Sequence, residues 1–201
     1  YVLVGTSSFF DRRETRDLMA YLKVIAQPAD EMSMLRIINT PARGIGESTV
    51  EKILTKAVKE KVRFWDIAAH AARESDIPKA AAGALQQFHD LLQRYREQVQ
   101  AHPRELGNLF RKLIAEIDYE SEINKQYKEP GQQMLRLETV EQMAESLDQY
   151  VARSENPSEK QADSSTRSDR PDAFRRSVPS LVPSLAGTFR GAADAVDGHA
   201  E

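Results

Sequence analysis

Apolar side chains recur at intervals of three and four residues along most of the chain, and this spacing constrains its fold most strongly. Such a stripe is typical of one face of an α-helix, whereas a half-buried strand shows apolar and polar residues in alternation. Prolines and glycines separate the stripes, and no stretch after Val4 alternates over the length of a strand. We therefore predict a mainly α fold, a helical bundle.

Breaks and capping residues place the individual helices. Asp11 and Asp30 stand where N-caps are favoured, while Pro78 and Pro103 suit the first turn of a helix. A loop is expected around residues 130–131, before the last helix. The predicted helices cover residues 12–26, 30–38, 47–61, 64–68, 78 to about 95, 103–117 and about 135–151.

The two ends of the chain differ from this body. Residues 1–4 are aromatic and β-branched, which predicts a short buried strand, and the chain begins with Tyr1 inside that run. We therefore expect the chain to be a fragment. Residues 156–201 are rich in Ser, Asp, Pro and Gly and lose the apolar periodicity. They are expected to be a mostly disordered, low-complexity tail, with a short helix near residues 186–196 as the alternative.

Composition excludes several classes of function. The chain has no cysteine and four scattered histidines, so thiol catalysis and zinc ribbons are excluded and no metal site is expected. Lys and Arg number 28 against 31 Asp and Glu, which excludes a polybasic DNA clamp but allows a local phosphate site. Apolar runs are too short to span a bilayer, so no membrane partner is expected.

The segment from Pro41 to Ile53 carries the strongest functional signal. A helix ends, a Gly-x-Gly turn follows, and a new helix starts at once. We expect both glycines to allow positive φ and close approach, and the amides of residues 46–49 to be unpaired donors for a phosphate oxygen. This is the pattern of a helix-hairpin-helix element, which grips the backbone of duplex DNA. The candidate DNA-binding residues are Thr40, Arg43, Gly44, Ile45, Gly46, Ser48, Thr49, Lys52 and, outside this segment, Arg12.

A purely structural interpretation of the same turn stays open. In that interpretation Ile45 plugs the core of a tight helix–helix connection, and the turn has no ligand. Glu47 and Glu51 also oppose an anionic partner, which predicts modest affinity.

Several motifs in order resemble the UvrD/Rep/PcrA-type superfamily 1 DNA helicases. They are the opening strand, Phe9-Phe10-Asp11-Arg12-Arg13-Glu14, the helix with Ala20-Tyr21-Leu22-Lys23, then Asn39-Thr40-Pro41, the Arg43-Gly44-Ile45-Gly46 turn, and Arg136-Leu137-Glu138 with Glu141. The resemblance covers about residues 1–153. It departs at Thr6, where the family has a second glycine, and nothing after Asn156 matches the family's continuation.

The resemblance implies a fold and a parent protein. Residues 1–28 would be the end of a segment of the second RecA-like motor domain, and residues 29–155 its inserted helical subdomain. The insertion would touch duplex DNA through the Gly44-Ile45-Gly46 turn, swivel, and so regulate unwinding. The parent would be a cytoplasmic, nucleoid-associated 3′-to-5′ DNA helicase that binds ATP, Mg²⁺ and a single DNA strand.

This chain has no Walker phosphate loop and no carboxylate pair after a buried strand. We therefore expect it to bind no cofactor and to be inactive as an ATPase by itself. Two alternatives remain: a free-standing helical DNA-binding module, and a helical scaffold that binds a protein partner without catalysis.

Overall fold

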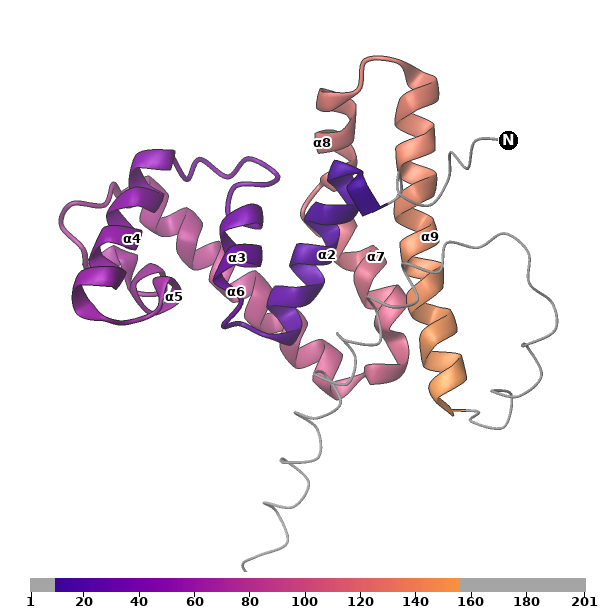
Figure 1. Cartoon of the computed structure of the whole chain (residues 1–201), viewed down its shortest axis with the longest axis horizontal. Coiled ribbons are helices and arrows are strands. Elements are labelled where there is room, and N and C mark those ends of the chain that lie inside the picture. Colours follow the sequence, from indigo (N-terminus) through magenta and orange to yellow (C-terminus); the bar gives the residue numbers. More distant parts are fainter. Residues whose placement is uncertain (1–9, 156–201) are drawn as a thin grey trace, which may run out of the picture. The chain divides into compact units, whose positions relative to one another are not determined.

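The computed structural model describes residues 10–155 of the chain. Within that range the chain is helical and contains no strand, as Figure 1 shows, so the predicted mainly α fold is confirmed. The expected strand at residues 1–4 and the expected disordered tail at 156–201 lie outside the described residues.

Between residues 10 and 155 the chain forms eight α-helices and two short 3₁₀ helices. They are α2 (Arg13–Ala26), α3 (Glu31–Ile37), α4 (Glu47–Glu60), α5 (Phe64–Ala68), η1 (Ala71–Arg73), α6 (Lys79–Ala101), η2 (Pro103–Glu105), α7 (Leu106–Glu116), α8 (Tyr119–Gln126) and α9 (Pro130–Glu155). None of these helices is long and apolar enough to cross a bilayer.

The helices differ from the predicted ones mainly after residue 100. Pro103 opens a 3₁₀ turn, and α7 follows it directly. Asp118 adopts a left-handed conformation (φ 54°), which ends the α7 segment and allows α8 to start at the next residue. Pro130 lies in the first turn of α9, where its missing amide costs nothing, so a helix replaces the loop expected there.

The described chain divides into two compact units, which we treat separately. Unit 2 is residues 17–97, and unit 1 combines residues up to 16 with those from 98 onward. Helices α2 and α6 contribute residues to both. The expected division into a motor-domain segment at residues 1–28 and its insertion at residues 29–155 remains a prediction.

Unit 2 has an aromatic core. Tyr21, Phe64 and Phe88 are almost fully buried, and the Phe88 ring lies edge-on to the rings of Tyr21 and Trp65, with centroids 6.4 and 6.0 Å apart. The Glu31 carboxylate accepts a hydrogen bond from the Phe64 amide (2.9 Å), so a side chain at the start of α3 caps α5. Ile53 and Ala57 bury the inner stripe of α4, as their spacing predicts.

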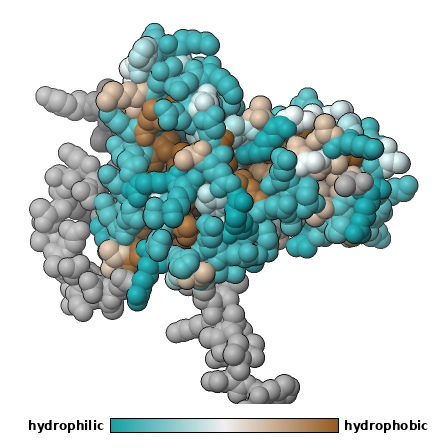
Figure 2. Space-filling view, turned by 180° about the vertical axis from the view of Figure 1, so that it is seen from behind, coloured by the Kyte–Doolittle hydropathy of each residue, from teal (hydrophilic) through white to brown (hydrophobic). Residues whose placement is uncertain are grey.

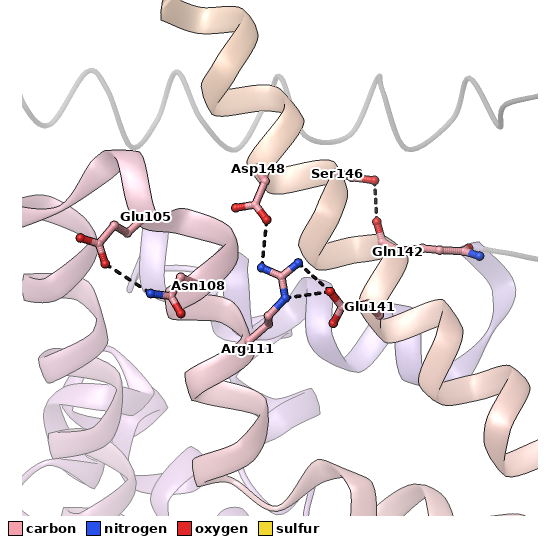
Figure 3. Close-up of polar contacts among 7 residues, drawn as sticks. All are labelled: Glu105, Asn108, Arg111, Glu141, Gln142, Ser146 and Asp148. Atoms are coloured by element: carbon pink, nitrogen blue, oxygen red, sulfur yellow. Dashed lines mark hydrogen bonds and ion pairs between the residues drawn. The ribbon is translucent and has the colours of Figure 1, made fainter.

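Unit 1 is built around α7, α8 and α9, which pack against one another. Figure 3 shows Arg111 reaching from α7 to two carboxylates of α9. Its guanidinium donates to Glu141 (2.6 and 2.8 Å) and to Asp148 (2.9 Å). The hydrogen bonds from Arg111 to Glu141 and Asp148 raise the pKa of Arg111 above its ordinary value.

The surface is mostly polar. Figure 2 shows hydrophilic side chains over most of the face drawn there, with apolar ones chiefly recessed between them. Within residues 10–155 the largest exposed apolar side chains are Met32 and Val58 in unit 2 and Met134 in unit 1. Val62 and Leu135 are partly exposed as well, and a few exposed apolar side chains are normal for a folded protein.

Candidate nucleic-acid interface

The predicted turn lies on the surface of unit 2, between α3 and α4. Gly44 is exposed and has φ +77°, Ile45 is 1% exposed, and Gly46 is the exposed N-cap of α4. Ile45 thus plugs the core, as the structural interpretation expects. That role leaves the exposed residues on both sides of Ile45 available to a ligand.

The two glycines have different roles. We expected positive φ at both, but the expectation was wrong for Gly46, which has φ −70° and ψ 155°. That conformation is open to any residue, and a Cβ at this position would meet nothing nearer than the Ser48 hydroxyl, at 3.9 Å. Only Gly44 is required by backbone conformation. Glycine at the N-cap instead leaves the start of α4 without a capping side chain.

The first amides of α4 are the donors that this start exposes. The amides of Thr49 and Val50 donate to the Gly46 carbonyl (3.0 and 3.2 Å), so the expectation of a free amide at Thr49 was wrong. Among the described residues, no acceptor pairs with the amides of Glu47 and Ser48. Unpaired amides at a helix start, together with the positive end of the helix dipole, favour an anion there.

The polar side chains near this start divide into exposed and buried ones. Ser48 is exposed, and Lys52 lies one helical turn later on the same side, with its ammonium donating to the Asp76 carbonyl (2.7 Å). An ammonium has three donors, so Lys52 keeps capacity for another acceptor. Thr49 is only 4% exposed and faces the interior, whereas Glu47 and Glu51 are exposed and reduce the local positive potential.

Arg43 and Thr40 are held inside unit 2. The Arg43 guanidinium donates to the carbonyls of Ile37 (2.9 Å) and Pro41 (3.1 Å) and to the Tyr21 hydroxyl. The Thr40 carbonyl accepts a hydrogen bond from the Tyr21 hydroxyl (2.7 Å), and the Thr40–Pro41 peptide is cis. These hydrogen bonds fix the loop that leads into the Gly44–Gly46 turn from the interior of unit 2.

Arg12 belongs to unit 1, whereas the turn belongs to unit 2. Its guanidinium donates to the Thr139 hydroxyl (2.6 Å), and its Nε is buried without a hydrogen-bond partner. The structure therefore gathers Ser48, Lys52 and the Gly44–Gly46 turn at one surface, backed by Thr40 and Arg43.

Three residues that shape the turn were not among the predicted site residues. Tyr21 and Phe88 contact the Arg43 guanidinium, with Phe88 as the nearer ring at 4.5 Å from the centroid. The Asn39 side chain accepts a hydrogen bond from the Arg43 amide (2.7 Å). An Asn two residues after the end of a helix is a local signal for such a turn, but nothing near Tyr21 or Phe88 in the sequence indicates a partner in this loop.

The chain is similar in sequence to part of several known proteins. Residues 1–165 match the protein family described as UvrD-like helicase C-terminal domain. The ATP-dependent DNA helicase Rep of Buchnera aphidicola subsp. Baizongia pistaciae is 35% identical over 128 residues, covering 64% of this chain and 19% of that helicase.

Two further relatives are ATP-dependent DNA helicases called PcrA. The protein of Staphylococcus epidermidis is 50% identical over 66 residues, 33% of this chain and 9% of that protein. The protein of Staphylococcus aureus is 38% identical over 96 residues, 46% of this chain and 13% of that protein. The chain thus spans between 9% and 19% of the length of these relatives. Because the family match extends over most of the sequence, the chain belongs to the UvrD-like helicase C-terminal domain family.

Proposed function

We propose that this chain is part of a UvrD/Rep/PcrA-type, ATP-dependent 3′-to-5′ DNA helicase, and that unit 2 contacts the backbone of duplex DNA within it. The observation that carries the proposal is the bare start of α4, where the amides of Glu47 and Ser48 have no acceptor among the described residues. Membership of a helicase family supplies the partner, because the relatives are named as DNA helicases.

The chemistry of this surface suits a phosphate and does not suit a base. Two backbone amides and the Ser48 hydroxyl are donors at the exposed start of α4, and the Lys52 ammonium adds a charge one turn away. Such donors hold a DNA backbone in register and carry no sequence information. The exposed carboxylates of Glu47 and Glu51 repel phosphate, so the contact should be weak. Because it depends on phosphate charge, it should also weaken as the salt concentration rises.

A backbone contact of this kind gives the parent helicase a grip on the duplex ahead of its motor. We propose that this grip regulates unwinding, since a module that holds the duplex controls how the duplex meets the motor. ATP, Mg²⁺ and the single strand would bind elsewhere in the parent protein. This chain alone should show no DNA-stimulated ATP turnover, and turnover above a mock-purified control would refute that part of the proposal.

The decisive experiment places a capping side chain on α4. Gly46→Asn and Gly46→Asp both suit the N-cap conformation, and their side-chain oxygens would cover the exposed amides. Helix stability should stay equal or rise by a few tenths of a kcal/mol. Duplex affinity, measured by fluorescence anisotropy in low salt, should fall for both variants, and further for Gly46→Asp because it adds a negative charge.

The control for net charge is Asn124→Asp on α8, an exposed position in unit 1. It should bind duplex as the parent chain does. A Gly46 variant that is as stable as the parent chain or more stable, but binds duplex more weakly, has lost the contact and not its fold. If the Gly46 variants stay folded and bind duplex unchanged, the turn has only a structural role and the proposed duplex contact is wrong.

Lys52→Ala gives a second, independent measurement. A lysine that neutralises one phosphate contributes about 0.9 to the slope of log affinity against log salt. The variant should lower that slope by about this amount, whereas Arg73→Ala, an exposed basic residue outside the turn, should leave it unchanged. Equal slopes for Lys52→Ala and the parent chain would remove Lys52 from the interface.

A further inference from the structure

A buried polar network lies behind the proposed DNA-contact turn. The Tyr21 side chain is fully buried on α2, and its hydroxyl donates to the Thr40 carbonyl (2.7 Å) while accepting from the Arg43 guanidinium. The same guanidinium donates to the carbonyls of Ile37 (2.9 Å) and Pro41 (3.1 Å). One side chain thus satisfies carbonyls both at the end of α3 and within the loop.

The guanidinium is also held by its surroundings. Its central carbon lies 4.5 Å from the centroid of the Phe88 ring, a distance at which a cation is attracted to the ring face. The Asn39 side chain accepts a hydrogen bond from the Arg43 amide (2.7 Å), which further restrains the loop. A cation beside the last carbonyls of α3 is favoured by the helix dipole as well.

These contacts engage both terminal nitrogens of Arg43. A bidentate phosphate contact needs those same nitrogens on the surface, in a fork that faces the ligand. Releasing them would leave the Pro41 carbonyl without this donor in a partly buried site. The Ile37 carbonyl would keep only the hydrogen bond from the Thr40 amide (3.1 Å), and the Tyr21 hydroxyl would lose the donor that it accepts from. The network therefore opposes a direct role for Arg43 at the DNA.

We propose that Arg43 is a positioning residue, which acts with Tyr21 to hold the loop so that the first amides of α4 face the DNA backbone, and that it does not itself contact a phosphate. This inference rests on the proposed duplex contact, but it assigns a role that the basic character of Arg43 would not suggest. It also gives a buried, uncharged residue, Tyr21, an effect on DNA affinity.

The test uses the full 201-residue chain with Tyr21→Phe and Arg43→Gln. Anisotropy titrations with duplex at four salt concentrations give both affinity and the salt slope. Tyr21→Phe should weaken binding about fivefold, the scale of one lost hydrogen bond, with the slope unchanged. Arg43→Gln should weaken binding at least as much, and its slope should also match the parent chain. Circular dichroism before each titration confirms that the variants are folded.

Two outcomes would overturn the inference. A salt slope that falls by about 0.9 in Arg43→Gln would show a direct phosphate contact. Full duplex affinity in folded Tyr21→Phe would show that the network does not position the turn.

Hydrogen exchange separates this inference from the proposed function. In Tyr21→Phe, amides of residues 37–46 should exchange faster than in the parent chain, while those in the middle of α6 stay unchanged. This readout needs no DNA. If the parent chain fails to bind duplex but exchange in the loop still rises, the proposed function fails and the network's hold on the loop stands. If exchange in the loop does not change, the inference fails whatever the DNA result.

Discussion

Replacing Arg136 by leucine should destabilise unit 1 far more than the same replacement at Arg111. Both arginines pair with carboxylates across helices, but their environments differ. Arg136 donates to Glu14 (3.1 Å), and these side chains are 22% and 2% exposed. The Tyr127 hydroxyl lies 3.4 Å from the same carboxylate, and its ring lies 4.9 Å from the Arg136 guanidinium. Glu14 therefore has little water to replace a lost partner.

The magnitudes follow from this difference in burial. Removing one partner of a buried ion pair costs about 3–5 kcal/mol, and the partial exposure of Arg136 favours the lower end of that range. Arg111 is 37% exposed, and its partners Glu141 and Asp148 are 53% and 46% exposed. Water solvates those carboxylates after the substitution, so we expect a loss of about 1 kcal/mol or less.

The assay must report on unit 1, because the chain contains two compact units and one overall unfolding transition is not assured. Hydrogen exchange of α9 amides in mild urea measures the opening free energy of that unit directly. Adding Glu14→Gln to Arg136→Leu should recover part of the loss, since the buried carboxylate is then uncharged. Losses for Arg136→Leu and Arg111→Leu that agree within about 0.5 kcal/mol would refute the argument from burial.

Three further predictions concern single positions. Gly107→Ala should cost unit 1 about 1 kcal/mol or less in thermal unfolding, because its Cβ would displace the half-exposed Asp148 carboxylate from Arg111. In an Asp148→Ala background the same substitution should cost nothing further. Gly44→Ala should cost about 1–2 kcal/mol in urea unfolding, since φ is +77°. Burial raises the pKa of Tyr21 to about 12, although Arg43 acts to lower it. The contribution of neutral Tyr21 to the free energy of unfolding should thus be present below about pH 10 and lost as pH rises through about 12. A pH titration of phenolate absorbance should show one tyrosine that ionises near pH 12, and Tyr21→Phe should remove that step.

Periodicity predicted most of the helices because each buries one apolar stripe. Ile53 and Ala57 in α4 lie in the core, as their spacing indicates. The method missed α8, in which only Tyr119 and Ile123 are buried, because two apolar residues do not make a recognisable stripe. It also misplaced the start of α9, since Pro130-Gly131 is a common loop signal and also suits a first turn.

The position of the candidate site was predictable from the sequence, but the roles of the individual residues within it were not. Gly-x-Gly before a new helix predicts a tight turn, and the structure places that turn at the surface of unit 2. The role of Arg43 depends on Tyr21 and Phe88, which reach it from other helices. Only tertiary packing brings such residues together, so a basic residue beside a predicted phosphate site is naturally assigned to the phosphate.

The buried network around Arg43 accounts for a helix α4 that starts without a capping side chain. Glycine at an N-cap holds a helix start less well than Ser, Asn or Asp, because it offers no side-chain acceptor for the first amides. That weakness is offset when the preceding loop is already restrained by Arg43, Tyr21 and Asn39. Because these buried contacts already fix the loop, α4 does not need a capping side chain to fix its start. The amides of Glu47 and Ser48 can therefore remain open to an external anion. If this reasoning holds, adding Gly46→Asn to Tyr21→Phe should recover much of the loop protection that Tyr21→Phe alone loses in hydrogen exchange. The double variant should nevertheless bind duplex more weakly than Tyr21→Phe alone. Recovery of both protection and binding would show that the open amides are not the contact.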